Sequence, residues 1–224
     1  MKKPNYMFLN ILFVIIGCIF MTYIETIICP DYWIKSIIKA ITFLGLYCIY
    51  NKIDKNSVSK PIKQNKKSII FYFVLCICVY AIIIITFIII QKIYDFSNIT
   101  SVLETNYSID KSNYIYVFLY ISFINSFLEE LFFRKFAFLT LAKHSSFKFA
   151  NIFSAAAFSI YHVSIIKGWF SASLFLVIIV ALFICGLFFN YIDSKNKTIY
   201  PSWLIHITAN LSINTIGIWL FTLK

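Results

Sequence analysis

Long apolar stretches alternate with short polar segments along the whole 224-residue chain. A membrane-spanning helix needs about 20 mostly apolar residues. The pattern therefore predicts seven spans, at residues 6–29, 33–50, 68–90, 113–139, 150–166, 169–192 and 202–223. Apolar side chains make up 61% of the sequence, against roughly 45–50% in soluble domains. We expect an all-α, polytopic transmembrane helical bundle of about seven spans, with eight helices as the alternative.

The net charge of +11 is concentrated in loops on one side of the predicted membrane. Six lysines lie in loop 51–67, and others lie in loops 140–149 and 193–200. Under the positive-inside rule these loops and the N-terminus are cytoplasmic in a multi-pass protein of the cell membrane. No nucleic-acid-binding motif accompanies the charge, so the lipid bilayer is the expected partner. Lys35 and Lys39, near the outer end of the second span, are expected to extend outward to the membrane surface.

The chain is expected to form one membrane-embedded unit with two groups of spans. Residues 1–112 hold the first three spans and the lysine-rich loop 51–67, and residues 113–224 hold the last four spans. The polar segment 91–112 is predicted to be an outer loop. The first span follows Lys2 and Lys3 as in a signal peptide. However, its apolar run is long and no small-x-small cleavage site follows, so we expect a retained span.

Ionisable residues inside spans are costly and indicate functional sites. The fourth span contains Glu129, Glu130 and Arg134, the only arginine of the chain. Glu130 and Arg134 are four residues apart and are expected to pair on one helix face. Glu129, about 100° around the helix, is then left without that partner and is a candidate general base. The alternative is a Glu–Arg pair that only anchors the helix.

Two histidines lie in spans: His162 in the fifth and His206 in the seventh. His206 and Asn210 are four residues apart and share a helix face, whereas His144 lies in a basic loop and is expected at the surface. Burying polar groups against one another is the least costly arrangement in lipid, so these residues are expected to converge with the two glutamates. His206 lies about five residues into its span and His162 about twelve. They therefore share a depth only if the fifth helix starts below the membrane surface or tilts strongly.

Three motifs in chain order are similar to those of the CPBP group, which comprises the type II CAAX prenyl-endopeptidases and the bacterial Abi, or bacteriocin-processing, proteins. The motifs are Glu-Glu-x-x-x-Arg at 129–134, Phe-x-x-x-His from Phe158 to His162, and His-x-x-x-Asn at 206–210. The resemblance covers residues 114–215. It implies an all-helical intramembrane endopeptidase that cuts near the C-terminus of a peptide or membrane-protein substrate.

The resemblance also implies roles for single residues. Glu129, with His162, would activate the attacking water, while His206 and Asn210 would stabilise the oxyanion. Glu130, Arg134 and Phe158 would support the site. The family has been argued both as glutamate-type and as metal-dependent, and Glu129, His162 and His206 could hold zinc. Because no His-Glu-x-x-His helix is present, we favour the mechanism without a metal cofactor.

Two other functions compete with proteolysis. A self-immunity or scaffold protein would bind a bacteriocin or a sensor kinase without cutting it. A transporter would also use buried Glu and His, but it is expected to show an inverted repeat and broken helices, for which five glycines and four prolines give little support. Richness in Ile, Lys, Asn and Tyr suggests an AT-rich bacterial genome, and hence a secreted signalling peptide or bacteriocin precursor as substrate rather than a prenylated protein.

Overall fold

The computed structural model describes residues 5–55, 62, 66–96 and 98–223. Within these residues the chain is helical and has no strands. Seven helices of the described part are long and apolar enough to cross a membrane. The all-α, seven-span architecture predicted from the sequence is therefore confirmed.

The N-terminal part contributes three spans. Helix α1 (Tyr6–Tyr23) continues into a π-helical turn, η1 (Ile24–Ile28), and is followed by α2 (Tyr32–Ile53) and α3 (Lys66–Ile90). Asp31 starts α2, because its Oδ1 accepts hydrogen bonds from the backbone N–H groups of Trp33 and Ile34, both at 3.0 Å. This is the usual N-cap role of an aspartate.

The fourth span changes helix type several times. It runs through α5 (Tyr114–Leu119), η2 (Tyr120–Asn125), α6 (Ser126–Glu129), η3 (Glu130–Thr140) and η4 (Leu141–Lys143). The last three spans are α7 (Phe147–Ile166), α8 (Ala172–Asn196) and α9 (Tyr200–Leu223).

The segments η2 and η3 on either side of Glu129 are π-helices, a rare form that is often found at functional sites. Side chains from neighbouring helices bond to backbone carbonyls of η3. Ser154 Oγ donates to the carbonyl of Phe133 at 2.6 Å, and Asn10 Nδ2 donates to that of Phe136 at 3.1 Å. Such polar insertions are a known cause of departures from α-helical geometry.

Segment 91–112 was predicted to be a loop. The structure shows that it contains the helix α4 (Asn98–Tyr107). Ile99, Leu103 and Tyr107 recur every four residues and pack as one apolar face in a cluster with Tyr114. The helix is short and its composition is polar, so a search for span-length apolar stretches does not detect it.

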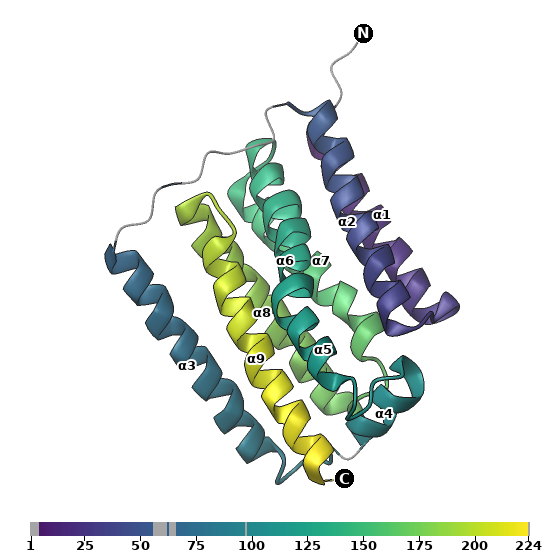
Figure 1. Cartoon of the computed structure of the whole chain (residues 1–224). Coiled ribbons are helices and arrows are strands. Elements are labelled where there is room, and N and C mark those ends of the chain that lie inside the picture. The colour runs from purple at the N-terminus through teal and green to yellow at the C-terminus, as the bar shows by residue number, and fades with distance from the viewer. Residues whose placement is uncertain (1–4, 56–61, 63–65, 97, 224) are drawn as a thin grey trace.

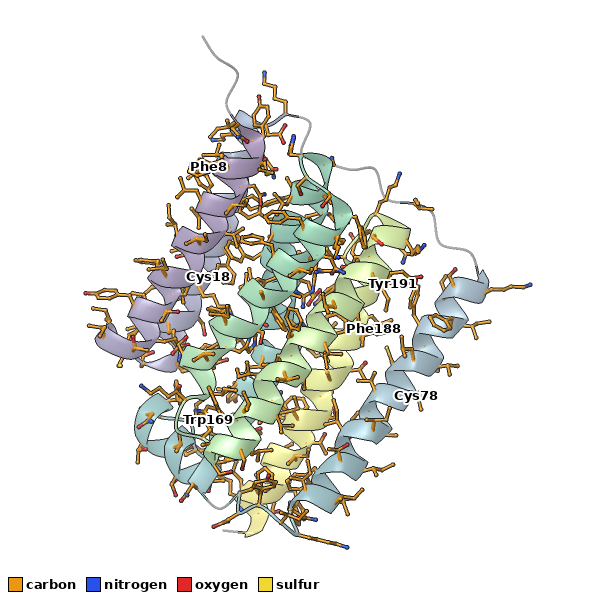
Figure 2. All side chains as sticks on the ribbon, turned by 180° about the vertical axis from the view of Figure 1, so that it is seen from behind. Phe8, Cys18, Cys78, Trp169, Phe188 and Tyr191 are labelled. Atoms are coloured by element: carbon orange, nitrogen blue, oxygen red, sulfur yellow. The ribbon has the colours of Figure 1, made fainter. Side chains whose placement is uncertain are left out.

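The helices form a bundle whose two edges differ (Figure 1). Helix α3 lies at one edge, packed along α9, while α1 and α2 lie at the opposite edge. Helix α4 lies at the end of the bundle where α9 also ends. Apolar side chains project outward over much of the surface, including Phe8 and Phe188 (Figure 2). A surface of this kind fits lipid as the solvent.

An aromatic core joins the first two spans to the fourth and fifth. The rings of Phe43 and Phe132 stack at 3.9 Å, and Phe43 also contacts Phe133 and Tyr161. These rings are fully or almost fully buried. Helix α2 is thereby fixed against η3, directly beside the residues singled out in the sequence.

The basic loop around His144 predicted a free surface residue, but the structure gives His144 a buried partner. Its Nε2 lies 2.7 Å from Oδ2 of the buried Asp54, at the end of α2. The rings of His144 and Tyr6 are 5.3 Å apart. The contact ties the end of the fourth span to the first two, which local composition could not predict.

Candidate active site

Glu129 is the last residue of α6 and is almost completely buried. Its Oε2 atom lies 3.8 Å from Nε2 of His162 on α7 and 3.7 Å from Nε2 of His206 on α9. The convergence of the fourth, fifth and seventh spans expected from the sequence is therefore observed. These distances are longer than direct hydrogen bonds. A small molecule placed between the three atoms could therefore bond to each of them.

The depth mismatch between His162 and His206 is resolved by the ends of the helices. Helix α7 begins at Phe147, earlier than predicted, and the fourth span extends to Lys143 before the chain turns. His162 lies 15 positions after the start of α7, and His206 lies 6 positions after the start of α9. For the two histidines to meet, α7 therefore starts farther from the site than α9 by roughly 14 Å of helix rise, or is inclined to it.

Both histidines are held by their Nδ1 atoms. His162 Nδ1 lies 2.7 Å from the backbone carbonyl of Phe158, one turn earlier, and His206 Nδ1 lies 2.9 Å from Oε1 of Glu130. Because a carbonyl or carboxylate can only accept, each Nδ1 carries the proton. Each Nε2 therefore faces Glu129, as a lone pair in the neutral ring or as a donor in the charged one.

Glu129 has a cationic partner, contrary to the sequence prediction. Lys39 of α2 places its Nζ 2.5 Å from Glu129 Oε1 and 2.7 Å from Asn125 Oδ1. Asn125 Nδ2 also donates to Glu129 Oε1, at 3.0 Å. The expectation that Lys39 extends outward is wrong, because the packing of Phe43, one turn further along α2, turns this face of the helix inward.

Lys35, one turn from Lys39 toward the outer end of α2, is also buried rather than extended to the surface. Its Nζ lies 2.7 Å from Glu25 Oε2 and 4.0 Å from the ring centroid of Tyr107. Tyr107 lies in α4, outside the spans, and burial raises the pKa of its hydroxyl to about 12. The ring thus stays neutral at physiological pH and contributes a cation–π contact.

Glu130 and Arg134 form the predicted pair, with Arg134 Nε 3.4 Å from Glu130 Oε2 and both side chains fully buried. The guanidinium lies over the ring of Phe158, at 4.2 Å from the ring centroid, and near that of Phe189, at 5.4 Å. Its nitrogens have no hydrogen-bond partner among the described residues. Arg134 is therefore held by one carboxylate and by aromatic faces.

Asn210 lies one turn beyond His206 on α9, and its Nδ2 donates to the backbone carbonyl of Ile121 at 3.1 Å. Ile121 belongs to the π-helix η2. A primary amide has two N–H donors, and Asn210, which lines the cavity, uses one of them to bond η2.

Sequence reasoning missed Lys39, Asn125 and a buried pair beneath Glu130. Ser202 Oγ donates to Asp193 Oδ2 at 2.7 Å, and both side chains are fully buried. Asp193 lies near the predicted end of the sixth span, where a carboxylate is easily interpreted as a loop residue. Lys39 carried a signal, since it is an ionisable residue inside an apolar stretch, but its direction could not be deduced.

A cavity of about 400 Å³, here called the Glu129 cavity, extends from α4 to Glu129. Most of its lining is apolar and aromatic, and Glu129, His162, His206 and Asn210 lie at its inner end together with Lys39. An apolar cavity with a few convergent polar groups is typical of a ligand-binding site.

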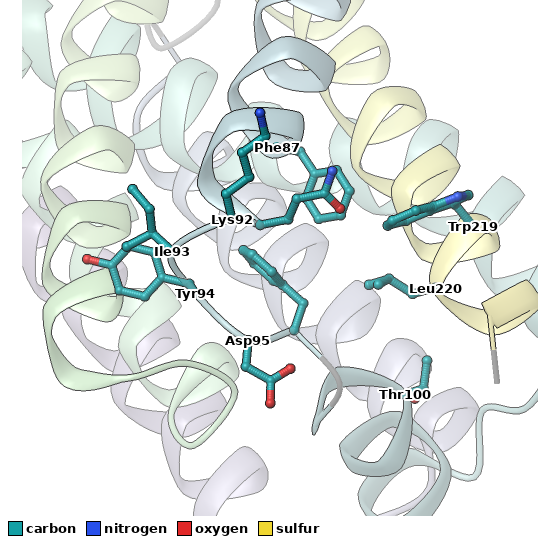
Figure 3. Close-up of a pocket in the computed structure, with 10 residues that line it drawn as sticks. Phe87, Lys92, Ile93, Tyr94, Asp95, Thr100, Trp219 and Leu220 are labelled. Carbon is teal, nitrogen blue, oxygen red and sulfur yellow. The ribbon is translucent and has the colours of Figure 1, made fainter.

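A second pocket of about 620 Å³, here called the α3–α9 pocket, lies beside the first at the α4 end (Figure 3). Phe87, Phe96 and Leu220 line both spaces. Lys92, Asp95 and Trp219 also line the α3–α9 pocket. The Glu129 cavity thus adjoins a wider space at the end of the bundle.

The described residues contain no group of three His, Cys, Asp or Glu side chains arranged to hold a metal ion. Glu129, His162 and His206 come nearest to such a group. The distances of 3.7–3.8 Å from Glu129 Oε2 to the two Nε2 atoms are wider than the roughly 3.4 Å that tetrahedral bonds of 2.0–2.1 Å would give. The ammonium of Lys39 also lies against the same carboxylate.

Residues 111–212 match a family model described as type II CAAX prenyl endopeptidase Rce1-like. The matched segment contains all three motifs, from Glu129 to Asn210, and confirms the resemblance seen in the sequence. The similarity of these residues to the Rce1-like family supports an intramembrane CAAX-type protease. No curated protein and no solved structure matches the chain.

Proposed function

We propose that the protein is an intramembrane endopeptidase that hydrolyses a peptide bond near the C-terminus of a membrane-associated protein or peptide, without a metal cofactor. The observation that carries this proposal is the position of Glu129 Oε2, between His162 Nε2 and His206 Nε2 at the inner end of an apolar cavity. A carboxylate and two imidazoles directed at one point can move protons at a reacting atom.

In the proposed reaction a water molecule binds between Glu129 and His162. Its oxygen forms a bond to the carbonyl carbon of the substrate while Glu129 Oε2 accepts a proton. The carbonyl oxygen becomes negative and is stabilised by the second N–H of Asn210 and by His206 Nε2, when the imidazole is protonated. Collapse of this intermediate breaks the C–N bond, and the proton held by Glu129 passes to the leaving amine.

Glu130 and Arg134 support this arrangement rather than react. Glu130 Oε1 holds the His206 ring by its Nδ1 atom, and Arg134 balances the charge of Glu130. Phe158 has a double role, because its carbonyl orients His162 while its ring covers the guanidinium. Such contacts preserve the geometry on which proton transfer depends.

The shape of the Glu129 cavity favours an extended apolar peptide as substrate. Its lining includes Tyr32, Val117, Ile165 and Trp169, and it approaches the α4 end of the bundle, opposite the end at which α2 finishes at Ile53 (Figure 1). With the basic loops on the cytoplasmic side, as the positive-inside rule predicts, the cavity faces the exterior. A secreted signalling peptide or bacteriocin precursor meets both conditions.

The experiment is cleavage of a quenched peptide library by the purified chain in detergent. Wild type is compared with Glu129→Gln, His206→Ala and the control His144→Gln, whose site is remote from the cavity. Loss of a general base or an oxyanion donor typically costs about 10²–10⁴-fold in rate. We expect losses of this size for the first two variants and near wild-type rates for the control, all unaffected by a zinc chelator.

Cleavage by Glu129→Gln at the wild-type rate would overturn the proposal, and chelator-sensitive cleavage would overturn its metal-free part. If the two site variants also retain full biological function in cells, the alternative of a non-proteolytic protein that binds a bacteriocin or sensor kinase is favoured instead.

A further inference from the structure

We infer that Lys39 is the resident cation of the site: it orients Glu129 and takes the electrostatic place that a divalent metal would occupy. The role of Glu129 rests on the proposed function, but the role of Lys39 rests on contacts of its own. Lys39 belongs to α2, outside the matched residues 111–212. It is therefore a contribution of the N-terminal spans, which lie outside the matched segment.

The ammonium of Lys39 is buried and contacts several side chains. Its ammonium donates to Glu129 Oε1 and Asn125 Oδ1, and it lies 5.1 Å from the ring centroid of Tyr161 and 5.6 Å from that of Phe43. The side chain is 8% exposed. An ammonium placed this way has exchanged its water shell for one carboxylate, one amide and two aromatic faces.

The contact with Lys39 gives the two carboxylate oxygens of Glu129 different surroundings. Oε1 accepts from both Lys39 and Asn125, so the plane of the carboxylate is fixed. Oε2 is left facing His162 and His206. Without the ammonium, one of the two donors that hold Oε1 is lost and the direction of Oε2 is no longer determined.

The same geometry shows how Lys39 acts against a metal ion. Oε2 lies farther from each of the two Nε2 atoms than tetrahedral ligands lie from one another, by a few tenths of an ångström. Both histidines already have their Nδ1 atoms bound to acceptors, as metal-ligating histidines do. If Oε2 and the two Nε2 atoms moved slightly closer together, they would form a three-ligand metal site. The positive charge of Lys39 beside Glu129 opposes the binding of a cation there.

Lys35, the neighbouring lysine on this face, does not share the role. Its ammonium pairs with Glu25 at 2.7 Å, so its charge is balanced within the cavity wall. Lys35 is therefore the matched control, being a buried lysine of the same helix, one turn away.

The test uses cobalt(II) as probe, because four-coordinate cobalt with histidine and carboxylate ligands has strong visible absorption bands. The full-length chain in detergent, stripped with a chelator, is titrated as wild type, Lys39→Met, Lys39→Gln, Lys39→Arg and Lys35→Met. We expect both neutral Lys39 variants to bind one equivalent at least tenfold more tightly than wild type, with four-coordinate bands. Lys39→Arg and Lys35→Met should behave like wild type.

Adding His162→Ala to Lys39→Met should abolish the bands, which places the ion on the histidines. Lys39→Gln keeps hydrogen bonding without charge, so it covers the case in which Lys39→Met does not fold, and circular dichroism reports the folding of each. The inference is overturned if the folded neutral variants bind no more tightly than wild type, or if wild type itself shows the bands. Because the readout is ion binding, it stands apart from peptide cleavage, and a failure of either proposal can be recognised separately.

Discussion

Replacing Arg134 by methionine should strongly destabilise the protein, because the buried carboxylate of Glu130 would lose its cation. Both side chains are fully buried, and the pair is held at 3.4 Å. At that distance, and with an effective dielectric constant of about 20, the attraction is roughly 5 kcal/mol. Removal of one partner from a buried pair costs about 3–5 kcal/mol in measured cases.

The double variant Glu130→Gln/Arg134→Met should recover most of this loss. Glutamine still offers an oxygen to His206 Nδ1, and methionine fills the space between the rings of Phe158 and Phe189. The guanidinium nitrogens lack hydrogen-bond partners among the described residues. Hydrogen bonds to the guanidinium therefore offset little of the free energy that burying the wild-type pair costs. Buried pairs of this kind can often be replaced by apolar groups at little net cost.

Thermal unfolding in detergent, followed by tryptophan fluorescence, measures both variants. Arg134→Met should lower the melting temperature by on the order of 10 °C, and Glu130→Gln alone should also lower it, because it leaves the arginine unpaired. The double variant should lie closer to wild type than either single variant. A single variant as stable as wild type, or a double variant as unstable as the sum of the two, would refute the reasoning.

Three further changes test the packing of the bundle. Gly186→Val should lower the free energy of unfolding by about 1–3 kcal/mol, because a Cβ there would lie 3.0 Å from Cα of Ala155. An unchanged melting temperature would show that α7 and α8 can separate freely. Gly45→Ala meets nothing within 4 Å and should raise stability by up to about 1 kcal/mol through helix propensity, whereas a loss would indicate a contact that the structure does not contain. His144→Ala removes the 2.7 Å contact with Asp54 and should cost about 1.5–3 kcal/mol in the same melting assay, and a negligible shift would assign that contact to the surface.

The spans and three motifs could be predicted because each depends on local chemistry. A stretch of about 20 apolar residues in lipid is helical since its backbone has no other way to bond. Glu130 with Arg134, and His206 with Asn210, share faces by helix geometry alone. The convergence of three spans followed from the cost of isolated polarity in lipid, and the structure places His162 and His206 each within 3.8 Å of Glu129, as that cost requires.

Lys39, by contrast, depends on packing that no local pattern contains. A lysine near the end of a span can reach the surface or turn inward, and the sequence spacing is the same in both cases. The stacking of Phe43 on Phe132 decides between them, because it fixes which face of α2 meets the fourth span. The π-helix η3 escapes prediction for a related reason, since side chains of α1 and α7, which are remote in sequence, bond to its backbone carbonyls.

The depth of Glu129 sets a minimum tether length for any peptide that is cut there. Glu129 lies 15 positions after Tyr114, which starts the fourth span at the α4 end, so it is about 22 Å from that end at 1.5 Å per residue. An extended peptide advances about 3.3 Å per residue and needs roughly seven residues to cover this distance. A folded body that stays outside the bundle must therefore carry an unstructured tail of at least about that length, which makes tail length itself a criterion by which candidate substrates can be selected or rejected.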